Sequence, residues 1–227
     1  MKILDIYKQY EIPPDLIEHQ LNVASVGQFI WDTLLPPFQK TVSVDDLTKA
    51  LLIHDMGNFA KYNLEKFPIK GWSAEYAKEA QKRFIAKWGD NATEATYKIA
   101  EDLGVSSDIV EIMRSIGFEN ASNIYKETNH AQMISNYADQ RVTPEGVMPL
   151  LERLEEGRAR YVLTPRFRNK DKNEKRKDRR AYNKGRDALL GIESLLFTFS
   201  NIGPEYVIDE TIAVYKSKLM IYDFNAK

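Results

Sequence analysis

The 227-residue sequence contains no cysteine, and it has only three histidines. Disulfide bonds, thiolate metal sites and cysteine nucleophiles are therefore excluded, so any bound metal must be held by histidine, carboxylate or other oxygen ligands. No apolar run approaches the roughly 18 residues that span a bilayer, and the N-terminal residues lack the apolar core of a signal peptide. These absences predict a cytoplasmic protein that does not enter a membrane.

Strand-like alternation of apolar and polar residues is also missing, whereas helix signals recur along the whole chain. With 43% hydrophobic and 29% charged residues, the composition is that of a globular domain, so we predict an all-α fold. Ser43 is expected to cap a helix, and Gly57 and Asn58 are expected to stop it. The predicted helices span about 14–30, 43–54, 73–88, 91–103, 107–116, 123–142, 149–161 and 204–220, and the turn TPEG closes the long one at 142.

Two of the three histidines lie on the apolar sides of predicted helices. His19 falls between Leu16 and Val23, and His54 follows Leu51. A single inward histidine is more often a core residue bonded to backbone groups than a metal ligand. Asp55, however, stands next to His54 and too near the core side to be freely solvated, so its carboxylate needs a cation or hydrogen-bond donors. A divalent ion would satisfy all three side chains.

A second aspartate, Asp139, stands near the end of the long predicted helix beside the small residues Ser135 and Ala138. Small neighbours let another helix approach closely, although an isolated aspartate in this position is usually an ordinary helix-end residue. Taken together, the inward histidines and the aspartates form an H…HD…D pattern on successive helices.

With this pattern, the sequence resembles the HD-domain superfamily of metal-dependent phosphohydrolases over about residues 16–161. The resemblance implies an HD-domain helical bundle in residues 1–162, and residues 163–227 would form a basic arm and two extra C-terminal helices packed on it. It also implies the ligands of one divalent metal ion: His19, His54, Asp55 and Asp139. Such ligands suit Mn, Fe, Co, Ni, Zn or Mg and do not distinguish between them.

Departures from the family pattern refine the expected chemistry. The remaining histidine, His130, would lie about 13 Å along one helix from Asp139, so we expect one metal and disfavour the two-iron oxygenase chemistry known in the superfamily. Asn58 stands where many members have a Glu or Lys, and an amide cannot transfer a proton at neutral pH. Asp55 is therefore the predicted general base, with Asn58 orienting a water molecule or a phosphate.

Two cations near the metal ligands are candidates for binding the phosphate of a substrate. Lys61 follows Asp55 by six residues, and Arg141 follows Asp139 by two. Arginine in particular suits bidentate phosphate contacts, but each of the two could equally be a solvated surface charge.

The segment 166–186 carries eleven Lys or Arg against three acids, although the net charge of the chain is only −1. One interpretation is a solvated charged helix or a mobile insertion, with (i, i+4) or (i, i+3) ion pairs between its cations and acids, and the other is a contact with a phosphorylated ligand or RNA. An ordered arm could also form a lid or a homodimer contact. The leading hypothesis is a single-metal phosphohydrolase that acts on a phosphomonoester or phosphodiester, with nucleotides as the expected substrate class. Its rival is a helical RNA-binding or regulatory protein with a structural metal site.

Overall fold

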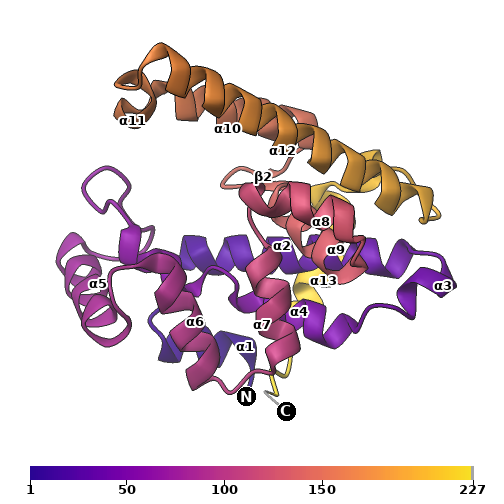
Figure 1. Cartoon of the computed structure of the whole chain (residues 1–227). Helices are drawn as coiled ribbons and strands as arrows, with labels where there is room; N and C mark the ends of the chain where they lie inside the picture. Colours follow the sequence, from indigo (N-terminus) through magenta and orange to yellow (C-terminus); the bar gives the residue numbers. More distant parts are fainter. Residues whose placement is uncertain (226–227) are drawn as a thin grey trace.

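The computed structural model describes residues 1–225, and it confirms the all-α class (Figure 1). Within this range, 13 α-helices and one two-stranded hairpin are found, and 72% of the chain is helical. The elements are α1 Ile3–Gln9, α2 Pro14–Thr33, α3 Pro36–Gln39, α4 Val44–Ile53, the 3₁₀ helix η1 Met56–Lys61, α5 Ala74–Trp88, α6 Ala92–Asp102, α7 Ser107–Ser115, η2 Phe118–Asn120, α8 Ala121–Glu127, α9 His130–Asp139, β1 Val142–Thr143, β2 Gly146–Val147, α10 Leu150–Leu163, α11 Pro165–Arg168, α12 Lys172–Thr198, η3 Pro204–Tyr206 and α13 Asp209–Leu219.

Side-chain caps set several of the helix starts that the sequence predicts. Ser43, Ser73 and Asn91 each accept a hydrogen bond from a backbone N–H in the first turn of α4, α5 and α6. These contacts satisfy donors that would otherwise lack a partner at a helix N-terminus. The predicted boundaries of these three helices and of α7 lie within two residues of the observed ones.

The single helix predicted over 123–142 is wrong. Thr128 adopts a left-handed backbone conformation with φ 54°, which ends α8, and the Asn129 side chain then caps the start of α9. The predicted turn TPEG closes a short β-hairpin, in which Thr143 pairs with Gly146. Likewise, the last α-helix begins at Asp209 and not at Pro204, because Pro204–Tyr206 forms a 3₁₀ turn.

Helix α2 is the central helix of the bundle, and α4, α9 and α13 all pack against it. Its inward residues Val23, Val26 and Ile30 are completely buried, and each such side chain stabilises the fold by about 1.5–3 kcal/mol. A Cβ atom at Gly27 would lie 2.3 Å from the Cδ1 atom of Leu51, so glycine permits the close approach of α4. This packing brings the start of α2 beside the ends of α4 and α9.

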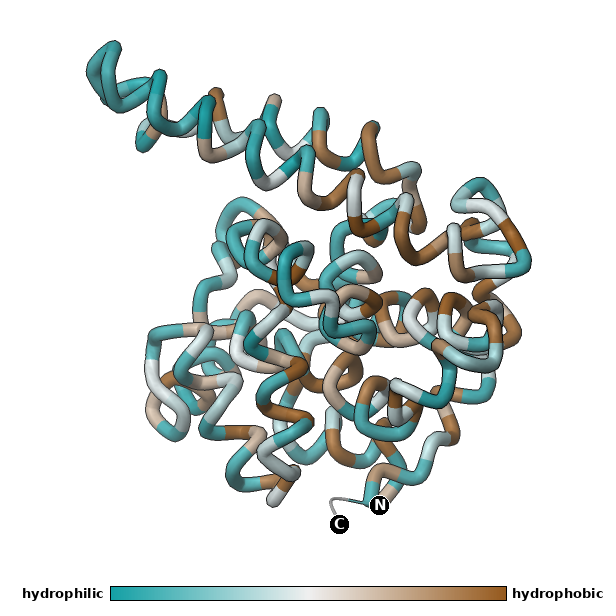
Figure 2. Tube along the Cα trace, turned by 45° about the vertical axis from the view of Figure 1, so that its right-hand side comes forward, coloured by the Kyte–Doolittle hydropathy of each residue, from teal (hydrophilic) through white to brown (hydrophobic). Residues whose placement is uncertain are grey.

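Residues 150–186, which form α10, α11 and the first half of α12, make a helical hairpin that we call the arm. Figure 1 shows the arm lying above the layer of α8 and α9, with α11 at its far end. Figure 2 shows that the far end is hydrophilic and that apolar residues gather toward the body. There Leu189, Ile192 and Leu196 of α12 are buried, so the second half of α12 anchors the arm on α8 and α9.

The C-terminal part returns to the first helices. Helix α13 packs along α2, and an isolated bridge pairs Lys2 with Asp223. No helix among residues 1–225 has the length and apolarity needed to span a bilayer.

Replacing Gly57 by alanine is expected to destabilise the protein by about 1–3 kcal/mol, the usual range for overpacking. A Cβ atom there would lie 2.0 Å from the carbonyl oxygen of Ala92 and 2.5 Å from the amide nitrogen of Thr96, both backbone atoms of α6. Gly57 thus permits the close approach between η1 and α6. Urea unfolding of Gly57→Ala tests this, with Gly157→Ala in α10 as a comparison, where the atom nearest to an added Cβ is the far end of the Arg153 side chain at 3.1 Å. Equal stability of Gly57→Ala and the wild type would contradict it.

Candidate metal centre

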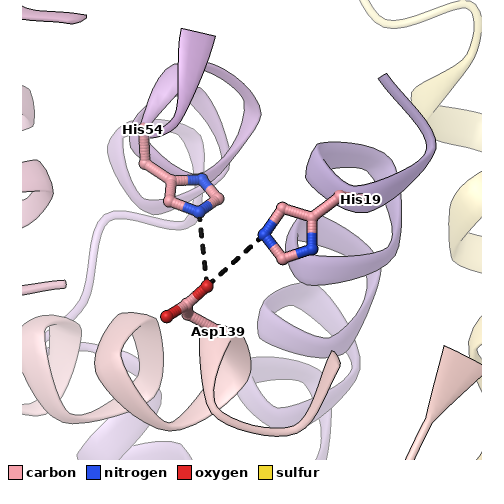
Figure 3. Close-up of side chains that lie close together, drawn as sticks. All are labelled: His19, His54 and Asp139. Carbon is pink, nitrogen blue, oxygen red and sulfur yellow. Dashed lines mark ion pairs between the residues drawn. The ribbon is translucent and has the colours of Figure 1, made fainter. Parts of the chain in front are cut away.

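Three of the predicted metal ligands converge at one end of the bundle (Figure 3). His19 lies in the second turn of α2, His54 directly follows α4, and Asp139 is the last residue of α9. One ligand atom from each residue lies within 4.8 Å of the other two. The structure therefore contains a largely buried group of side chains that could hold a metal ion.

The distances within this group fit a single ion. Asp139 Oδ1 lies 3.4 Å from His19 Nε2 and 3.5 Å from His54 Nε2. Two ligand atoms that are each about 2.1 Å from one ion are separated by about 3.0–3.4 Å in octahedral or tetrahedral geometry. Only a small movement of these side chains is needed to bind an ion.

His54 has the hydrogen bonding of a metal ligand. Its Nδ1 atom lies 2.8 Å from the carbonyl oxygen of Leu51, so Nδ1 carries the proton and donates it. The Nε2 atom, which faces Asp139, is buried and has no hydrogen-bond partner among residues 1–225. A backbone carbonyl that fixes the tautomer in this way leaves the Nε2 lone pair for a metal ion. The residues present therefore fit a divalent ion.

In the metal-free protein, the charges around His54 favour a proton on its imidazole, at the position that the ion would occupy. Burial lowers the pKa of His54, but Asp55 and Asp139, with the Leu51 carbonyl, outweigh burial and raise this pKa to about 9. For Asp139, burial raises the pKa, and the close imidazoles of His19 and His54 lower it far below its ordinary value. A metal ion at this position would replace the proton and neutralise the charge of the Asp139 carboxylate.

Asp55, the fourth predicted ligand, lies beside this group. Its Oδ2 atom is 3.7 Å from His19 Nε2 and 3.8 Å from His54 Nε2. It is not part of the set whose ligand atoms all lie within 4.8 Å of one another. Asp55 therefore contacts both histidines, and its role as a direct metal ligand stays a prediction.

Three further side chains lie near the centre and were not found from the sequence. Gln140 donates from Nε2 to Asp139 Oδ2 at 2.8 Å, which leaves Oδ1 directed at the histidines. The fully buried Gln20 accepts the backbone N–H of Asp55 at 3.3 Å. Burial raises the pKa of Tyr62, and the carboxylates of Asp15 and Asp55 raise it further. An amide or a tyrosine carries no pattern that marks such a role in a sequence.

The remaining predicted site residues lie at different distances from the centre. Asn58 is in the same turn as Asp55, because its backbone N–H donates to the carbonyl oxygen of Asp55 at 2.8 Å. Lys61 is exposed at the end of η1, and no carboxylate within residues 1–225 pairs with it. His130 starts α9, where its Nδ1 atom lies 2.9 Å from the Thr41 hydroxyl, so it belongs to another part of the bundle.

The prediction that Arg141 binds the substrate phosphate is wrong. Its side chain is only 2% exposed, and its guanidinium donates to the carbonyl oxygens of Met148 and Val207 and to the hydroxyl of Tyr137. Glu193 of α12 lies 3.7 Å away. The N–H groups of the Arg141 guanidinium are therefore all occupied, and their contacts link α9, the hairpin, α12 and η3.

Replacing Arg141 by alanine is expected to lower the free energy of unfolding by about 3–5 kcal/mol, because it leaves the partly buried carboxylate of Glu193 and the carbonyl groups of Met148 and Val207 without their partner. Arg141→Lys is also expected to be destabilising, since a lysine cannot reproduce the forked contacts. Chemical unfolding checks both variants. An unchanged stability combined with a raised KM for a phosphorylated substrate would restore the phosphate role.

Metal binding is expected to release about one proton per ion at pH 7, because His54, with its pKa of about 9, must lose its proton first. The apparent affinity should rise about tenfold per pH unit up to about pH 9. The same raised pKa stabilises the metal-free fold fully below pH 6.5, and this contribution is lost as the pH rises through about 9. Calorimetric metal titrations in two buffers of different ionisation enthalpy measure the proton. A pH-independent affinity would contradict the assignment.

Comparisons with known proteins found no relative of this chain. No family model matches the chain, and no curated protein and no solved structure matches it.

Proposed function

We propose that this protein is a single-metal, HD-type phosphohydrolase that hydrolyses a phosphomonoester or phosphodiester, with nucleotides as the substrate class. The main support is the convergence of His19, His54 and Asp139, with the buried Nε2 atom of His54 left without a hydrogen-bond partner among residues 1–225. The order of these residues along the chain, with Asp55 after His54, is the reason for the HD assignment.

His19, His54 and Asp139, with Asp55 as the fourth ligand, would hold one divalent ion. When bound, such an ion would lower the pKa of a water molecule, polarise the P–O group and neutralise developing charge. A mixed set of imidazole and carboxylate ligands is compatible with Mn, Fe, Co, Ni, Zn or Mg.

Asp55 is the proposed general base. Its side chain is 29% exposed and lies beside both histidines, so its Oδ2 atom can accept the proton of an attacking water molecule. Asn58, in the same turn, would orient this water or the phosphate through its amide. The exposed ammonium group of Lys61 would attract the phosphate toward the centre.

The rival function, an RNA-binding or regulatory protein with a structural metal site, is favoured by one observation. Of the eleven cations in 166–186, only Lys170 and Arg186 form ion pairs in the described structure. The three acids of this segment make other contacts. Asp171 and Glu174 form the capping box at the start of α12, and Asp178 forms an ion pair with Lys170. The (i, i+4) ion pairs that the sequence predicts along this helix are therefore absent from this part of the described chain.

Hydrolysis assays distinguish the two functions. Metal-free protein would be supplied with each divalent ion in turn and assayed with generic phosphomonoesters and phosphodiesters and with nucleotides. We expect metal-dependent turnover, and we expect Asp139→Ala to lose it while keeping its helical circular dichroism. Salt-sensitive RNA binding that depends on 166–186, together with no turnover under any ion, would support the rival instead.

A further inference from the structure

A large cavity separates the arm from the body of the protein, outside the metal centre. Residues of α10, α11 and α12 line one side, and residues of η2 and α8 line the other. Its volume is about 920 Å³, which is the upper part of the range for small-molecule sites. We call it the arm cleft.

The arm cleft is positively charged. Five cations line it, Arg153, Arg158, Arg160, Arg179 and Lys184, against two carboxylates. Arg158, Arg179 and Lys184 have no ion-pair partner within the described chain, and the buried Nε atom of Arg153 has no hydrogen-bond partner there. A multiply charged anion would satisfy these groups.

Flat aromatic surfaces accompany the cations. The rings of Phe118 and Tyr182 stack on each other in the wall of the cleft, with their centroids 5.5 Å apart and an interplanar angle of 18°, and the guanidinium of Arg158 lies over Tyr182. The close approach of Phe118 depends on Gly185, where a Cβ atom would lie 2.7 Å from the ring. Such stacked aromatic and guanidinium planes suit a planar ring such as a nucleobase.

One residue connects the arm cleft with the metal centre. Gln140 lines the cleft, and its Nε2 atom donates to Asp139 Oδ2 at 2.8 Å. The side chain of Gln140 therefore contacts both the cleft and Asp139, although none of the four metal-pattern residues lines the cleft itself.

We propose that the arm cleft binds a nucleotide with more than one phosphate, and that this nucleotide is the substrate presented to the metal centre. The identification as substrate rests on the proposed phosphohydrolase function, whereas the binding itself does not. The base packs against the Phe118 and Tyr182 rings, the arginines hold the phosphates, and the arm supplies a subsite that the four-residue metal pattern does not contain.

The grouping of the cations and aromatic rings around one cavity favours a small nucleotide over an RNA strand. A nucleic-acid surface that follows a backbone needs cations spread along a groove and aromatic rings at successive bases. Here the rings of Phe118, Tyr161, Phe167 and Tyr182 all line one cavity, and three of its arginines come from α10, outside 166–186.

Neighbouring arginines of α12 provide a matched test. Arg179 lines the cleft, whereas Arg180 does not, and both are exposed without an ion pair in the described chain. The binding of ATP, AMP and adenosine to the full-length protein is measured by calorimetry in EDTA, so that the metal centre does not contribute. We expect ATP to bind more tightly than AMP, Arg179→Glu to weaken ATP binding by at least about tenfold, and Arg180→Glu to change it by less than about threefold.

Equal effects of the two substitutions, or no ATP binding by a folded wild type, would overturn the proposal. Tighter binding of a ten-nucleotide RNA, with equal dependence on Arg179 and Arg180, would overturn it in favour of an RNA surface along the arm. A different result would show that only the phosphohydrolase proposal is wrong. In that case ATP binds in a way that depends on Arg179, but no ester is hydrolysed under any ion.

Discussion

His54→Ala is expected to reduce the bound metal from one divalent ion per chain to none. The substitution removes a nitrogen that is buried, fixed in one tautomer and directed at Asp139, so the ion loses a ligand that solvent replaces poorly. Loss of a group that hydrogen-bonds a metal ligand already lowers metal affinity by about 10–100-fold, and loss of the ligand itself should lower it further. Elemental analysis of protein equilibrated with metal and then desalted measures the effect.

The third histidine provides the control. His130 lies on the same helix as Asp139, is partly buried and packs against Phe38, but it hydrogen-bonds Thr41 and takes no part in the metal group. His130→Ala should therefore retain one ion per chain even if it is less stable. Loss of metal from both variants, or from neither, would contradict the assignment of the centre.

Asp55→Asn is expected to lower turnover by about 10²–10⁴-fold, the usual contribution of a general base. The amide has nearly the shape of the carboxylate but cannot accept the proton of the attacking water. His19, His54 and Asp139 remain, so metal should still bind, with reduced affinity if Asp55 is also a ligand. Turnover and metal content are measured on the same preparation.

Asp15→Asn is the matched control for this substitution. Asp15 lies in the first turn of α2 and, like Asp55, acts on the pKa of Tyr62, but it has no contact with the histidines within 4 Å in the described structure. It should retain nearly full turnover. An Asp55→Asn protein that retains both its metal and full turnover would exclude Asp55 as the base.

Features governed by neighbouring residues could be predicted from the sequence. Helix starts follow from caps such as Ser43 and Asn91, whose side chains bond N–H groups two or three residues away. The inward position of His19 follows from the helical period of its apolar neighbours. The group that the structure brings together, His19, His54 and Asp139, could therefore be identified as three inward polar residues on three helices.

Features that depend on distant residues could not be predicted. Arg141 is held by Met148, Glu193 and Val207, which reach it only through the hairpin, α12 and η3. Thr128 breaks the helix although a β-branched residue rarely adopts a left-handed conformation, so it carries no breaker signal. The roles of Gln20 and Gln140 likewise depend on which carboxylate or backbone group lies within reach after folding.

Titration of metal-free protein with a divalent ion, followed by activity at each step, tests the central claim most directly. We predict that phosphoester hydrolysis rises in proportion to the ion bound and reaches its maximum at one ion per chain, and that Asp139→Ala shows neither binding nor activity. A protein that binds one ion at this centre and hydrolyses no phosphoester with any of the candidate metals would contradict the account.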